Sequence, residues 1–68
     1  MEIFAKRLRE LRKEKKLSQR ALAKILGVNQ KTISSYENNY YEPPQVIQVK
    51  IAELFGVSVD YLLGRVDY

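Results

Sequence analysis

Residues 19–38, QRALAKILGVNQKTISSYEN, decide the fold, because they read as two short helices joined by a sharp turn. Ser18 precedes the first helix, and its hydroxyl can accept a hydrogen bond from a free amide of the first turn. Gly27 ends that helix, since glycine adopts the left-handed conformation at little steric cost. Asn29 is placed to cap the second helix, residues 30–37. Apolar residues follow helical spacing in the first helix, namely Leu22, Ala23, Ile25 and Leu26.

The second of these helices is mostly polar. Only Ile33 and Tyr36 are expected to point inward, which leaves hydrogen-bonding side chains on the outer face: Gln30, Lys31, Ser34 and Ser35. A polar helix can simply be solvated, or it can enter the major groove of DNA. The residues around this helix favour the second possibility, insertion into the major groove. The small Ala23 allows a close crossing, and a set of apolar residues fills the wedge between the helices: Leu22, Leu26, Val28, Ile33 and Tyr36.

Length and composition limit the other possibilities. The chain has 68 residues, which predicts one compact domain, and it contains neither cysteine nor histidine. Disulfides, thiolate metal sites and the commonest catalytic base are therefore excluded. No apolar run approaches the roughly 20 residues that span a bilayer, and the N-terminus lacks the pattern of a signal peptide. We expect a cytoplasmic protein that needs no cofactor.

Charge is distributed unevenly along the chain. Residues 1–36 hold ten Lys or Arg and three Glu, for a net charge of +7, whereas residues 37–68 carry a net charge of −3. A basic half can be only a solvated surface, but it also suits a polyanion, because neutralising phosphates releases counterions.

Three further helices are expected, so the predicted fold is all-α with five helices. Residues 3–15 place Phe4, Leu8 and Leu11 on one apolar face. Another helix should begin at Pro44 and run to about Phe55, with Ile47, Ile51, Ala52 and Phe55 buried. The last should follow Ser58 and end at Gly64, with Val59, Leu62 and Leu63 inward. An asparagine, Asn38 or Asn39, should take the left-handed conformation after the polar helix.

Several segments, in order and over nearly the whole chain, resemble the phage-repressor and Cro-like helix-turn-helix family. They are LRELRKEKKLSQ, ALAKILGV, TISSYEN, the proline-initiated fourth helix and GVSVDYLLG. The resemblance implies a DNA-binding domain of five helices. It also implies a salt bridge between Arg12 and Glu37 that joins the first helix to the end of the recognition helix.

The same resemblance assigns DNA contacts. Gln30, Lys31 and Ser35 would read base edges, with Asn29 and Ser34 as flanking candidates. Gln19 would bind a phosphate and brace the first recognition side chain, and Asn38 and Tyr40 would also contact phosphate. Chemically, glutamine can pair with adenine and lysine can donate to guanine.

Two departures from the family pattern stand out. The loop after the recognition helix, NNYYEPP, lacks the usual basic residues, so we expect binding to depend less steeply on salt. Its tyrosines could instead pack on the fourth helix. In that helix Gln45 and Gln48 replace common apolar residues, so either the helix is rotated or an apolar patch faces a partner. The resemblance implies a homodimer, with these candidate contacts: Val46, Val49, Tyr61, Val66 and Tyr68.

The sequence therefore predicts a sequence-specific regulator, a repressor in the first instance, that binds an inverted repeat in double-stranded DNA as a homodimer. Half-sites would lie one DNA turn apart, about 34–36 Å. No enzymatic chemistry, membrane segment or small-molecule effector is indicated. The alternative is a protein-interaction module on the same fold, such as the antitoxin partner of a toxin.

Overall fold

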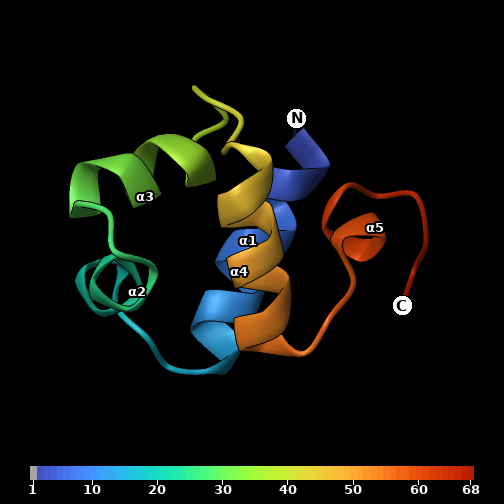
Figure 1. Cartoon of the computed structure of the whole chain (residues 1–68), viewed down its shortest axis with the longest axis horizontal. Helices are drawn as coiled ribbons and strands as arrows, with labels where there is room; N and C mark the ends of the chain where they lie inside the picture. Colours follow the sequence, from blue (N-terminus) through green and yellow to red (C-terminus); the bar gives the residue numbers. More distant parts are fainter. Residues whose placement is uncertain (1) are drawn as a thin grey trace.

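The computed structural model describes residues 2–68 of the chain. This part contains five helices, joined by turns and loops, and no strand. The helices are α1 (Glu2–Glu14), α2 (Gln19–Leu26), α3 (Gln30–Glu37), α4 (Gln45–Phe55) and α5 (Val59–Leu62). In Figure 1, α2 and α3 lie on one side of α1 and α4, and α5 lies on the other. No helix in this part of the chain is long and apolar enough to cross a bilayer. The predicted all-α fold is confirmed.

A single apolar core joins all five helices. The expected stripe of α1 is buried, as are the four expected core residues of α4, and Leu8, Leu22 and Ile33 are completely inaccessible. Burying a side chain of this size contributes about 1.5–3 kcal/mol. Ile25, which also follows the helical spacing of α2, is 53% exposed, because the inward face of this short helix is already filled by Leu22, Ala23 and Leu26.

The turn between α2 and α3 forms as the sequence predicts. Ser18 Oγ accepts from the Ala21 amide at 2.9 Å, and Asn29 Oδ1 accepts from the Thr32 amide at 2.8 Å. Gly27 ends α2 with φ +74°, and the following amide, of Val28, donates back to the Ala23 carbonyl at 3.0 Å. These bonds satisfy amides and carbonyls that the two short helices leave open.

Some other helix ends differ from the prediction by one or two residues. Pro44 has ψ 158° and lies just before α4 as its cap, because its extended backbone offers only the carbonyl to the first turn. The end of α3 agrees with the prediction, because Asn39, one of the two asparagines expected there, takes the left-handed conformation with φ +62°. Helix α5 ends at Leu62, before Gly64, and both Val59 and Leu63 are half-buried.

Arg7 fastens the C-terminal segment to α1, which the sequence did not reveal. Its Nη1 donates to the carbonyl oxygens of Tyr61 and, at 2.8 Å, Val66. Its guanidinium carbon lies 4.2 Å from the centre of the Tyr61 ring, in cation–π geometry. Close by, Gly64 has φ +79°, and a Cβ there would lie 2.8 Å from Ile3 Cγ2, so another residue would be strained and would displace the Ile3 side chain. The C-terminal turn therefore packs closely on α1.

The left-handed residue after α1 gives a testable prediction. Lys16 has φ +57°, a conformation that costs an L residue about 1–2 kcal/mol. We expect Lys16→Gly to raise the free energy of unfolding by about 1 kcal/mol, measured by urea denaturation. Lys15→Gly is the matched control, because it removes the same charge from a residue whose amide still donates to the helix, to Leu11. It should lower stability, and equal effects of the two changes would contradict the strain at Lys16.

Candidate nucleic-acid interface

Helix α3 presents a polar face beside a buried one. Ile33 and Tyr36 are buried, at 0% and 6% exposed, and burial raises the pKa of the Tyr36 hydroxyl. Gln30 and Lys31 in the first turn are exposed, whereas Ser34 and Ser35 are half-buried. The long polar side chains therefore project from the N-terminal half of α3. Asn29, which was expected to flank them, holds the helix start through Thr32.

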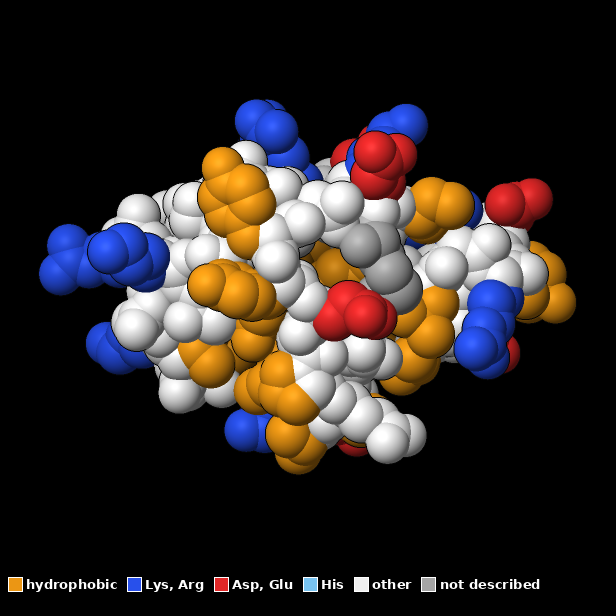
Figure 2. Space-filling view, turned by 90° about the horizontal axis from the view of Figure 1, so that it is seen from above, with side chains coloured by type: hydrophobic (Ala, Val, Ile, Leu, Met, Phe, Trp, Pro, Cys, Tyr) orange, Lys and Arg blue, Asp and Glu red, His pale blue; other side chains and the backbone are white. Residues whose placement is uncertain are grey.

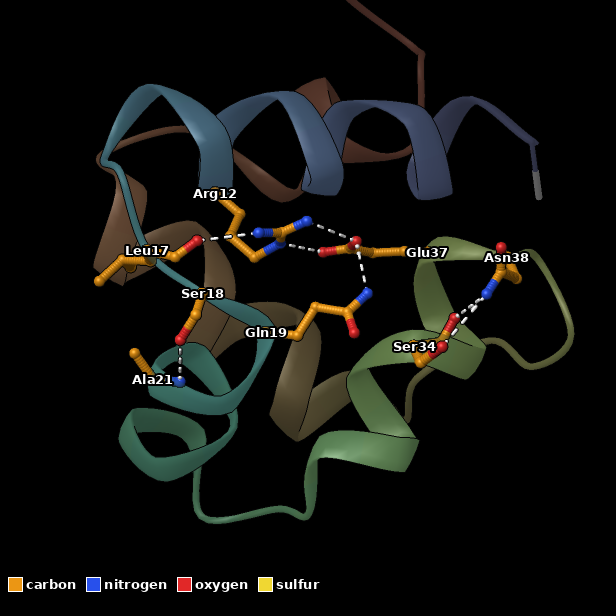
Figure 3. A network of polar contacts seen from close by, with 8 residues as sticks. All are labelled: Arg12, Leu17, Ser18, Gln19, Ala21, Ser34, Glu37 and Asn38. Carbon is orange, nitrogen blue, oxygen red and sulfur yellow. Dashed lines mark hydrogen bonds and ion pairs between the residues drawn. The ribbon is translucent and has the colours of Figure 1, made fainter.

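A buried ion pair fixes the other end of α3. Arg12 Nε lies 2.6 Å from Glu37 Oε2, and Arg12 Nη2 lies 3.0 Å from Glu37 Oε1, so the pair is bidentate. The two side chains are only 12% and 3% exposed. Arg12 Nη1 also donates to the Leu17 carbonyl at 2.8 Å, which ties in the segment before α2. Figure 3 shows these groups meeting between α1, α2 and α3.

Gln19 completes this network. Its Nε2 donates to Glu37 Oε1 at 3.1 Å, so Gln19 supports the end of α3 and not Gln30 at the start of that helix. This differs from the role that the resemblance implies. The physical reason is that the buried carboxylate of Glu37 needs more donors than one guanidinium supplies. Gln19 remains half-buried at the edge of the network.

Asn38 and the following amides are used within the molecule. Asn38 Nδ2 donates to the carbonyl and hydroxyl oxygens of Ser34, at 2.9 and 3.2 Å. The backbone amides of Asn38, Asn39 and Tyr40 donate to carbonyls of α3. These backbone bonds close the end of α3 within the molecule, so a phosphate contact at this end would rest on side chains.

The two tyrosines of the loop are both exposed, but they have different neighbours. Tyr40 and Tyr41 are 74% and 69% exposed. Tyr41 lines an open hollow together with the cap of α3, Asn29, and three residues of the helix itself, Lys31, Thr32 and Ser35. Tyr41 thus shares a surface with the predicted base-reading residues, whereas the sequence analysis had put forward Tyr40. The order of the loop residues alone gave no signal to separate them.

The glutamines of α4 have distinct environments. Gln48 is half-buried, and its Nε2 donates to the Pro43 carbonyl at 3.0 Å, which fastens the loop to α4. Gln45 is exposed, as are Val46 and Val49, at 63% and 40%. An apolar pair is thus left on the outer surface of α4.

Charge is distributed unevenly on the face that Figure 2 shows. Lys and Arg side chains project from the end formed by α2 and α3 without acidic neighbours in this view, whereas toward α5 acidic side chains lie among further Lys and Arg side chains. The surface around α3 is therefore basic, as the uneven charge of the two halves of the sequence indicates.

A helix-turn-helix family model matches residues 8–62 of this chain. The chain belongs to this helix-turn-helix family. Within it, the Bacillus subtilis transcriptional regulators YobD, uncharacterized, and AnsR are 40% and 41% identical over 65 and 59 residues. These alignments cover 96% and 87% of this chain but 58% and 51% of the two relatives. The chain thus spans about half the length of these relatives.

Solved structures agree with the helix-turn-helix assignment. The P22 c2 repressor, crystallised in complex with a synthetic operator, is 34% identical with a TM-score of 0.82. That match covers 87% of this chain and 89% of the repressor chain. The DNA-binding domain of the same repressor in solution gives a TM-score of 0.81 at 35% identity, covering 88% of this chain and 79% of that one. The fold is that of a phage-repressor-like domain.

The Arg12–Glu37 pair gives a testable prediction for this helix-turn-helix domain. Glu37→Gln leaves the guanidinium of Arg12 buried without its counterion, so we expect a loss of about 3–5 kcal/mol in the free energy of unfolding. Asp60→Asn is the matched control, because Asp60 forms an exposed ion pair with Arg65 at 3.6 Å. That change should cost about 1 kcal/mol or less. Similar losses in urea denaturation would show that the buried pair does not hold the three helices together.

Proposed function

We propose that this domain is a sequence-specific, double-stranded DNA-binding transcriptional regulator that inserts α3 into the major groove. The observation that carries the proposal is the division of α3, which buries Ile33 and Tyr36 and exposes Gln30 and Lys31 at its N-terminal end. In helix-turn-helix proteins the N-terminal residues of the recognition helix contact base edges. Family membership and the likeness to a repressor bound to an operator support the same function.

Base reading rests on a small set of side chains. Gln30 has the amide geometry to pair with adenine N6 and N7, and Lys31 can donate to guanine O6 and N7. Ser34 and Ser35 are short, so they reach bases only through water or after close approach. Asn29 is occupied by its cap, which leaves it a secondary role.

Phosphate contacts would come from residues around the network. Gln19 is held by Glu37 at the start of α2, where a phosphate can approach. Asn38 and Tyr40 are exposed at the end of α3 and in the loop. Such contacts set the orientation of the domain on DNA without reading sequence.

The regulator would act as a homodimer on an inverted repeat, which places two α3 helices one DNA turn apart. Among the candidates for the dimer contact, Val46, Val49 and Tyr68 are exposed. Tyr61 and Val66 are half-buried and engaged by Arg7 of the same chain, so they contribute less free surface.

Selection from random duplex DNA at about 0.15 M salt, the physiological ionic strength, tests the function directly. We expect enrichment of an inverted repeat whose half-sites are centred about 10 base pairs apart. Absence of any enriched sequence, together with tight binding to one protein, would contradict the regulator and support an interaction module such as an antitoxin.

The predicted base-reading residues can be tested on the DNA site that the selection identifies. Gln30→Ala and Lys31→Ala should each lower specific affinity by about 1–3 kcal/mol, roughly 5- to 150-fold, and relax the preference at one base pair. Gln45→Ala and Lys50→Ala remove the same two residue types from the exposed surface of α4. Fluorescence anisotropy should show little change for this control pair. Unchanged affinity and preference in the α3 variants would rule out Gln30 and Lys31 as readers.

A further inference from the structure

A hollow lies where α1 meets the end of α3, outside the face that reads bases. Four residues of α1 line it, and three more belong to the end of α3 and the loop: Glu2, Ala5, Lys6, Arg9, Glu37, Asn38 and Asn39. Lys6, Arg9 and Asn38 are exposed, so their polar groups are accessible from solvent. The hollow therefore joins the basic first helix to the C-terminal end of α3.

The charges in this hollow are not balanced. Glu37 is already neutralised by the buried guanidinium of Arg12. The remaining charged side chains are Lys6 and Arg9 against Glu2, which leaves one net positive charge. An anion is thus the ligand that the hollow favours.

The loop cannot supply this anion contact by itself. Residues 38–44 contain Glu42 and no lysine or arginine. The backbone amides of Asn38, Asn39 and Tyr40 donate to carbonyls of α3 at 2.9, 3.3 and 2.9 Å, so they are not directed at a ligand. Positive charge near the end of α3 comes instead from α1, through Lys6 and Arg9.

The position of the hollow suits a DNA backbone. A helix of eight residues is about 12 Å long, and the major groove of B-DNA is about 12 Å wide. When the N-terminal residues of α3 contact base edges, its C-terminal end therefore lies near the rim of the groove, where phosphates run.

We infer that Lys6 and Arg9 bind a backbone phosphate of the operator in this hollow and replace the cations that the loop lacks. The inference rests on the proposed function and adds two residues to the phosphate contacts. Lys6 acts as a mobile point charge, and Arg9 can bind two phosphate oxygens at once. Glu2 opposes the contact, so its removal should strengthen binding.

The test compares the salt dependence of two double variants on the selected operator. Lys6→Gln/Arg9→Gln should make the slope of log K against log salt shallower by about 0.9, because one phosphate is no longer neutralised. Lys50→Gln/Arg65→Gln removes one lysine and one arginine from exposed sites outside the hollow. This control has the same net charge and should keep a slope close to that of the unchanged protein. Glu2→Gln should raise affinity at low salt.

The position of the contact can be found with neutral methylphosphonate linkages, placed one at a time across a half-site. One linkage should weaken the unchanged protein and leave the Lys6→Gln/Arg9→Gln variant unaffected. Equal slopes for the two double variants, or an equal response to every linkage, would overturn the inference while specific DNA binding stands. A protein that selects no duplex at all would overturn the proposed function itself.

Discussion

The buried ion pair between Arg12 and Glu37 holds together the three helices on which the interface depends. Arg12 belongs to α1, Glu37 ends α3, and their partners Leu17 and Gln19 flank the start of α2. Burying two charges costs free energy that a single contact does not recover. Here each Glu37 oxygen accepts at least one hydrogen bond, and none of the buried side-chain polar atoms in residues 2–68 lacks a partner. A complete polar network of this kind fixes one arrangement of the helices.

That constraint matters because α3 is too short to hold its own position. Eight residues form an isolated helix poorly in water, so tertiary contacts must stabilise it. Asn29 caps its start, Ile33 and Tyr36 anchor its middle, and Glu37 fastens its end. Gln30 and Lys31, on the polar face, are therefore not needed to hold α3 in place. A rigid support with a few exposed polar groups is what reading base edges requires.

Local patterns in the sequence were sufficient for the helices, because apolar spacing and capping residues act within a few positions of one another. Phe4, Leu8 and Leu11 could be assigned to the core on that basis, and Ser18, Gly27 and Asn29 to the turn. The same spacing does not show that Ile25 is exposed, because it cannot tell how many apolar residues of so short a helix reach the core. The pairing of Arg12 with Glu37, 25 positions apart, came from family resemblance and not from any local pattern. The hydrogen bonds from Arg7 to the C-terminal carbonyls could be predicted neither from a local pattern nor from the resemblance, because the sequence does not distinguish Arg7 from a solvated arginine.

The proposed phosphate contacts follow from how the first helix divides its surface. One side of α1 buries Phe4 and Leu8, and Arg12 closes the polar network. Lys6 and Arg9 remain outside, beside the end of α3. Cations carried on a helix that is fixed in this way lose less conformational freedom on binding than cations on a loop, because the backbone beneath them is already ordered. A loop rich in tyrosine and without cations is therefore compatible with firm binding to DNA, since α1 can carry the electrostatic share.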